Sequence, residues 1–236
     1  MRPINLAAAG LVCVLTACQA PGPPPVAPSW RDVLGDAAIA DPTLPLPPLT
    51  PITGARTTLV SWKRASSTPA IGAATFAWPT WTTVAGELKA FCRRYVAEKR
   101  PDPADLRRRV ERLLGMREGD GVGRVVVEFS VDTANVFRPC PDPSIGTTSC
   151  PVVYDIKELN ALLDRDPAAT RLLLQQILTS YVAQDGYPFT RGGYSYDWDP
   201  SAAAAHHVGL SEYVVKGAAP VEILSISPIE DYCAGQ

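Results

Sequence analysis

The prolines near the start of the chain set the strongest limit on what it can fold into. Ten of the 24 prolines in this 236-residue chain lie between Pro21 and Pro51. Clustered prolines lack backbone N–H donors and favour extended polyproline geometry, so they do not build helix or sheet interiors. We therefore predict a tether over residues 18–55 and a single folded domain over residues 56–236. About 180 residues are enough for one domain with its own core.

Residues 1–17 have the features of a bacterial export signal. Arg2 supplies a positive charge, and residues 6–15 form an apolar stretch broken only by small residues. That stretch is shorter than the roughly 20 apolar residues that span a bilayer. The following Leu15-Thr16-Ala17-Cys18 resembles the bacterial lipobox, in which the chain is cut before a cysteine that then receives lipid. The resemblance implies a lipoprotein anchored through Cys18, and an ordinary secretory signal containing a cysteine is the alternative.

The lipobox resemblance also implies a location. Several acyl chains on one cysteine hold a protein firmly to a membrane, whereas one chain binds marginally. In Gram-negative lipoproteins a residue other than Asp after the cysteine favours the outer membrane, and Gln19 follows here. We therefore expect a cell-envelope protein, at the outer membrane of a Gram-negative host and facing the periplasm or the cell surface. The membrane is its first expected partner, and an envelope glycan or protein is the second.

The remaining cysteines predict cross-links within the folded domain. They are Cys92, Cys140, Cys150 and Cys233. An even number in an exported domain predicts two disulfides, for which three pairings exist. The turn-rich segment between Cys140 and Cys150 could close on itself, and Cys92 would then pair with Cys233. Four-ligand zinc is disfavoured because no C-x-x-C pair exists and the two histidines are adjacent, so no metal or cofactor is expected.

Hydrophobic patterning predicts a mixture of helices and strands. Helical spacing marks residues 84–99, 103–114, 155–163 and 167–183, with Asp102 as an N-cap and Gly115 as a stop. Strand patterns mark residues 57–62, 124–131, 211–216 and 221–227. Residues 69–81 are expected to form a loop, and residues 30–40 a short helix, a docking segment or, as we favour, a flexible spacer. Without regular alternation, the pattern favours an α+β domain with about four helices and a small, mainly antiparallel sheet, braced by the two disulfides.

Charge is unevenly distributed along the chain. Residues 93–117 hold nine basic and four acidic residues, whereas residues 153–236 hold five basic and eleven acidic ones. A basic helical face could meet anionic lipid headgroups or acidic glycans, but more often it pairs with acids elsewhere in the fold. The net charge of −2 argues against whole-protein attraction to nucleic acid, so none is expected as a partner.

The segment from Tyr187 to Glu212 contains the materials of a chemical site. Arginine and tyrosine donors near carboxylates can build an acid–base or anion-binding site, and acids with histidines can hold a divalent metal. The structural alternative, which we favour, is a tight turn packed on the sheet, with the aspartates capping or pairing with the arginine. The candidate catalytic residues are Arg191, Asp197, Asp199, His206, His207 and Glu212.

Three blocks of sequence resemble a group of exported bacterial proteins of unknown function. The blocks are residues 137–143, residues 187–191 with 193–198, and residues 211–215, within a resemblance that covers roughly residues 88–215. The resemblance implies a single domain with these loops as its signature and brings no activity. Common enzyme motifs, including the nucleophile elbow and H-E-x-x-H, are not present. The first interpretation is a binding or structural envelope lipoprotein, and the second is a periplasmic hydrolase or transferase using residues 187–212.

Overall fold

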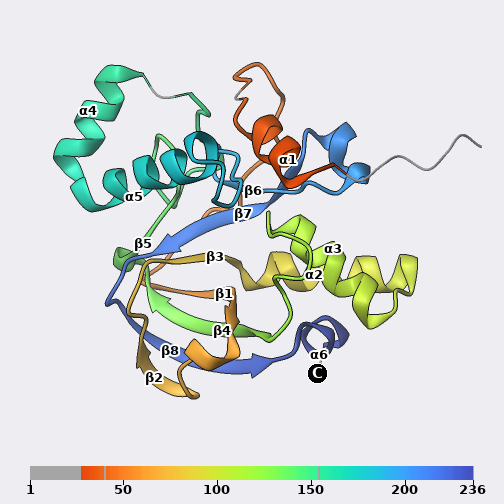
Figure 1. The fold of residues 1–236 in the computed structure, drawn as a ribbon. Coiled ribbons are helices and arrows are strands. Elements are labelled where there is room, and N and C mark those ends of the chain that lie inside the picture. Colours follow the sequence, from red (N-terminus) through yellow and green to blue (C-terminus); the bar gives the residue numbers. More distant parts are fainter. Residues whose placement is uncertain (1–27, 40, 154, 236) are drawn as a thin grey trace, which may run out of the picture.

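The computed structural model describes residues 28–39, 41–153 and 155–235 (Figure 1). The predicted signal peptide and Cys18 lie outside these residues. Within them, an eight-stranded sheet forms the centre, six α-helices surround it, and all strand pairings are antiparallel. The predicted α+β class is confirmed, but the predicted sheet is too small and the predicted number of helices too low. No described helix has the length and apolar character needed to cross a membrane.

The sheet has the strand order β2-β8-β4-β1-β3-β7-β5, and β6 pairs with β7 outside this path. The strands are β1 (Arg56–Arg64), β2 (Gly72–Thr75), β3 (Thr80–Val84), β4 (Arg124–Asp132), β5 (Val136–Phe137), β6 (Tyr194–Tyr196), β7 (Val208–Val215) and β8 (Pro220–Ser227). The expected loop over residues 69–81 was wrong in part, because β2 and the start of β3 lie there. Both strands are short, and their pairing with distant β8 and β7 stabilises them.

The helices form two groups around the sheet (Figure 1). Helices α2 (Ala85–Lys99), α3 (Pro103–Leu113) and α6 (Ile229–Ala234) pack together at one end. On the other side α1 (Trp30–Ala37) lies near β6, and α4 (Ile156–Arg165) packs against α5 (Pro167–Ile177). Helix α3 starts at the predicted residue and ends one residue before the predicted end. The Asp102 side chain accepts from the Asp105 amide at 2.8 Å, and Gly115 has φ +65°. A Cβ on Gly115 would lie 2.9 Å from the Pro188 carbonyl oxygen, so only glycine fits this turn.

Both faces of the central strands are buried. On one face Val60, Trp62 and Val126 pack against α2, α3 and α6, and on the other face Leu59 and Phe129 belong to a second cluster. The two predicted disulfides are present. Cys92–Cys233 joins α2 to α6, and Cys140–Cys150 closes the loop that follows β5.

The described part of the expected tether contacts the domain. Ser29 forms a capping box at the start of α1, and Leu34 in α1 and Leu49 are both only 1% exposed. The backbone amide of Leu49 donates to the Thr148 carbonyl at 2.8 Å. Parts of residues 28–39 and 41–55 therefore pack on the domain, and α1 forms where the sequence analysis favoured a flexible spacer.

Candidate functional site

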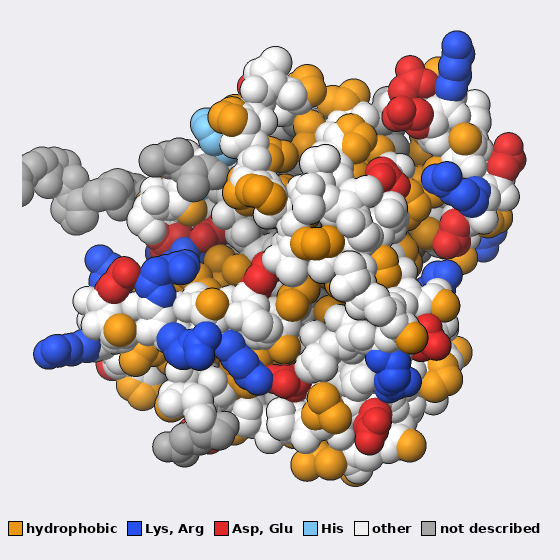
Figure 2. Space-filling model, turned by 180° about the vertical axis from the view of Figure 1, so that it is seen from behind, with side chains coloured by type: hydrophobic (Ala, Val, Ile, Leu, Met, Phe, Trp, Pro, Cys, Tyr) orange, Lys and Arg blue, Asp and Glu red, His pale blue; other side chains and the backbone are white. Residues whose placement is uncertain are grey.

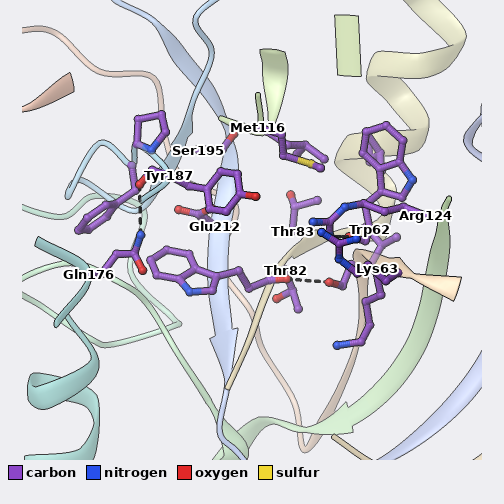
Figure 3. A pocket seen from close by; sticks show the side chains of 18 of the residues that line it. Trp62, Lys63, Thr82, Thr83, Met116, Arg124, Gln176, Tyr187, Ser195 and Glu212 are labelled. Carbon is purple, nitrogen blue, oxygen red and sulfur yellow. Dashed lines mark hydrogen bonds between the residues drawn. The ribbon is translucent and has the colours of Figure 1, made fainter. Parts of the chain in front are cut away.

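A cavity lies where two neighbouring strands separate. β1 pairs with β4 along its whole length, but it pairs with β3 only through Leu59 and Val60. Past Val60 the strands no longer pair, and a cavity of about 450 Å³ opens there (Figure 3). This volume lies within the range of small-molecule sites. Its apolar lining includes Trp81, Leu88, Leu114, Met116 and Phe189.

Glu212 places a carboxyl group in the cavity wall. It lies on β7 opposite Thr83 of β3, and its backbone amide donates to the Gly193 carbonyl at 2.7 Å. Its Oε2 is buried and has no hydrogen-bond partner among the described residues. Burial raises the pKa of Glu212 to about 8, so the protonated carboxyl predominates at neutral pH.

The opposite side of the cavity is basic. Figure 3 shows Arg124 and Lys63 near Trp62, across from Glu212, Tyr187 and Gln176. The Arg124 guanidinium donates to the carbonyl oxygens of Asp120 at 2.7 Å and Trp62 at 3.0 Å. Burial, followed by the nearby charge of Arg124, lowers the pKa of Lys63.

The cavity walls are held in place by internal hydrogen bonds. The Tyr187 hydroxyl donates to Asp120 at 2.8 Å, and Gln176 Nε2 donates to the Tyr187 carbonyl at 3.1 Å. Ser195 Oγ donates to the Leu113 carbonyl at 2.7 Å and accepts from the Leu210 amide at 3.0 Å. Because both bonds hold Ser195 in the fold, its hydroxyl is not poised as a nucleophile.

No protein family, curated protein or solved structure matches the chain. The resemblance of the three sequence blocks therefore stays a prediction. What the site can do is inferred from its geometry and chemistry.

Two of the candidate acids lie outside the cavity in ion pairs with α3. Asp197 accepts two bonds from Arg109, at 3.0 and 2.7 Å, and Asp199 accepts from Arg112 at 3.0 Å. Burial raises the pKa of Asp197, and the bonds from Arg109 oppose this only in part. Burial also acts to raise the pKa of Asp199, but bonds from Ser201 and Arg112 outweigh it and the pKa is lowered.

The basic face of α3 thus pairs with acids from elsewhere in the fold, the commoner of the two expected roles. Arg107 likewise contacts Glu230 of α6 at 2.5 Å. On the surface, basic side chains gather over α2 and α3 with acidic ones among them (Figure 2). The aspartates pair with Arg109 and Arg112 rather than with Arg191, the partner considered from the sequence.

The other candidate residues, Arg191, His206 and His207, also lie outside the cavity lining. Arg191 donates to the carbonyls of Ala37 and Ala38, at 3.2 and 2.6 Å, at the end of α1. His207 Nδ1 donates to the Asp197 carbonyl at 2.7 Å, and His206 is exposed. The described residues hold no group of three His, Cys, Asp or Glu side chains that could bind a metal.

Of the six candidates, only Glu212 lines the cavity. Sequence reasoning missed its basic side, because Lys63 and Arg124 lie in strands far from residues 187–212. One signal was available. β1 ends with Lys63 and Arg64, and β4, its neighbour in the sheet, begins with Arg124, so the pairing of these strands brings like charges together.

Proposed function

We propose that the protein is a lipid-anchored binding protein of the cell envelope that takes a small ligand in the cavity between β1 and β3. The observation that carries binding is the buried Oε2 of Glu212, which has no partner among the described residues at the wall of a 450 Å³ cavity. An unpaired buried polar atom costs about 1–3 kcal/mol, and a ligand that bonds to it removes this cost.

The contacts of the remaining candidates favour binding over catalysis. Asp197 and Asp199 accept hydrogen bonds from arginines of α3, and Arg191 donates to a backbone carbonyl at the C-terminus of α1. The hydroxyl of Ser195, which lines the cavity, donates to a backbone carbonyl. An enzyme would instead be expected to gather several such groups in one pocket.

Binding is tested by a thermal-shift screen of the detergent-solubilised full chain against anionic, neutral and cationic small molecules. At least one compound should raise the melting temperature. Leu114→Trp, which places a large ring in the cavity wall, should abolish that shift. Leu224→Trp is the matched control, because Leu224 is 45% exposed on β8 away from the cavity. Failure of every compound to stabilise the protein, or an equal shift in the Leu114→Trp variant, would contradict the proposal.

The envelope location is supported by the lipobox resemblance and by the two disulfides, which are typical of oxidising compartments. Mass spectrometry of the protein expressed in a Gram-negative bacterium should find lipid on Cys18 at a new N-terminus. Cys18→Ser should release the chain from the membrane fraction. An unmodified Cys18, or a mature chain that starts elsewhere, would contradict the anchor.

One observation favours a second candidate, a hydrolase or transferase. A carboxyl with a pKa of about 8 is protonated at neutral pH and can serve as a general acid. If the ligand found by the screen is turned over, Glu212→Gln should abolish turnover while retaining binding. A ligand recovered unchanged after long incubation supports binding alone.

A further inference from the structure

The unpaired groups of the cavity identify a class of ligand, an inference that rests on the proposed binding function. We propose that the cavity binds a small organic anion. Its carboxylate or phosphate group would contact Arg124, its apolar body would pack against Trp81 and Met116, and an acceptor oxygen would meet Glu212.

Three cations line one side of the cavity. In the β1–β4 register Arg64 lies directly opposite Arg124. Lys63, next to Arg64, donates to Thr80 Oγ1 at 3.4 Å and its Nζ lies 4.4 Å from the centre of the Phe76 ring, so Arg64 and Arg124 form the like-charged pair. All three line the cavity, and none forms an ion pair with any described carboxylate. Like charges directly across a strand pair are destabilising. A bound anion would turn this repulsion into attraction.

The unmatched polar groups are also hydrogen-bond donors. Nε and Nη1 of Arg124 bond to backbone carbonyls, while no described acceptor contacts its Nη2. The protonated Glu212 carboxyl supplies a further O–H donor at neutral pH. Such a lining favours a ligand rich in acceptor oxygens and disfavours an amine.

The arrangement of these groups sets the shape of the ligand. Glu212 and Arg124 lie on opposite sides of the cavity, with Thr83 and Met116 between them (Figure 3). The wall also includes the apolar side chains of Trp81 and Leu114. A ligand that reaches both polar ends therefore needs an apolar or aromatic middle, with oxygens at its two ends.

Four probes with one 4-hydroxyphenyl body, which supplies the second oxygen, test the proposal: 3-(4-hydroxyphenyl)propionate, 4-hydroxyphenyl phosphate, and the amide and amine that correspond to the propionate. Calorimetric titration of the full chain should detect at least one anion, with the amide and amine at least about tenfold weaker, since charge-assisted bonds are roughly twice as strong as neutral ones. The stronger of the two anions shows whether carboxylate or phosphate is preferred.

Arg124→Met should weaken anion binding at least about tenfold, because it removes the guanidinium. Arg124→Lys keeps the charge without the planar fork and should give an intermediate affinity, which also guards against a folding defect in the first variant. Arg93→Met is the matched control, because Arg93 is exposed on α2 outside the cavity, and it should bind like the native protein.

Binding of neither anion, or equal anion binding by native protein and Arg124→Met, overturns the inference. If the amide or amine binds more tightly than the anions and Leu114→Trp blocks it, the anion proposal fails while the binding function stands. If no compound in this set or in the wider screen binds, both proposals fail.

Discussion

Two regions of the molecule combine arginines with carboxyl groups, and they differ in how these groups are paired. In the ion-pair cluster, Arg109 and Arg112 of α3 meet Asp197 and Asp199 directly. In the cavity, Glu212 and Arg124 face the same space with no carboxylate–guanidinium contact. Paired buried charges hold two segments together, whereas unpaired ones cost stability and leave bonding capacity for a ligand. The pairing of charged groups therefore distinguishes the ion-pair cluster, which joins two segments, from the cavity, which we propose binds a ligand. The residue types in the two regions are the same.

The largest effect is expected from breaking the ion-pair cluster. Asp197→Ala leaves the Arg109 guanidinium without its main partner where the two side chains are only 12% and 5% exposed. Removing one member of a buried pair destabilises a protein by about 3–5 kcal/mol. Urea denaturation should show this loss in the free energy of unfolding.

The control is Asp105→Ala, whose exposed pair with Arg108 should be worth less than about 1 kcal/mol. Ligand binding should persist in the folded fraction of Asp197→Ala. A loss below about 1 kcal/mol for Asp197→Ala, or a specific loss of ligand affinity, would contradict the division between the two regions.

The Glu212 carboxyl in the cavity wall should make the free energy of unfolding depend on pH. The folded pKa of Glu212, about 8, lies above its usual 4.5, so folding favours the protonated form. The contribution of the protonated Glu212 carboxyl to the free energy of unfolding is fully present below about pH 4.5 and is lost as the pH rises through about 8. The loss should reach a few kcal/mol, since each tenfold difference in proton affinity is worth about 1.4 kcal/mol.

Glu212→Gln provides the comparison, because its side chain does not titrate. Urea denaturation of both proteins from about pH 5 to about pH 9 should show the native protein losing stability relative to the variant. Parallel stability curves would mean that Glu212 titrates normally and is solvated. A bound ligand whose oxygen accepts from the Glu212 carboxyl should steepen the dependence, because ionising the carboxyl would remove that donor.

The smallest effect is expected at Arg191, which belongs with the structural region. Arg191→Ala removes the bonds to the Ala37 and Ala38 carbonyls at the end of α1. Charged groups at a helix C-terminus are worth about 0.3–1 kcal/mol, so the melting temperature should fall by a few degrees. Proteolysis should detect earlier cleavage near α1, and ligand affinity should be unchanged. A large loss of affinity would place Arg191 in the binding machinery instead.

Local signals in the sequence were enough to predict several elements. Asp102 and Gly115 mark the ends of α3 because an N-cap and a positive-φ glycine act within one turn of the helix. The alternating pattern of β4 identified it as a strand, since successive side chains of a strand point to opposite faces of the sheet. The short, turn-rich segment between Cys140 and Cys150 likewise favoured the pairing that the structure contains.

Only the tertiary structure decided how these elements combine into a sheet and a site. β3 is a strand because it pairs with β7. This pairing places Thr83 opposite Glu212, which is distant in the sequence. Asp197 meets Arg109 across 88 residues, a contact that spacing along the chain does not encode. The sequence alone indicated Glu212 but grouped it with its neighbours, whereas folding placed it in a cavity with Arg124. Composition reveals which groups are present, but burial and pairing, which determine what those groups can do, arise only when distant segments pack together.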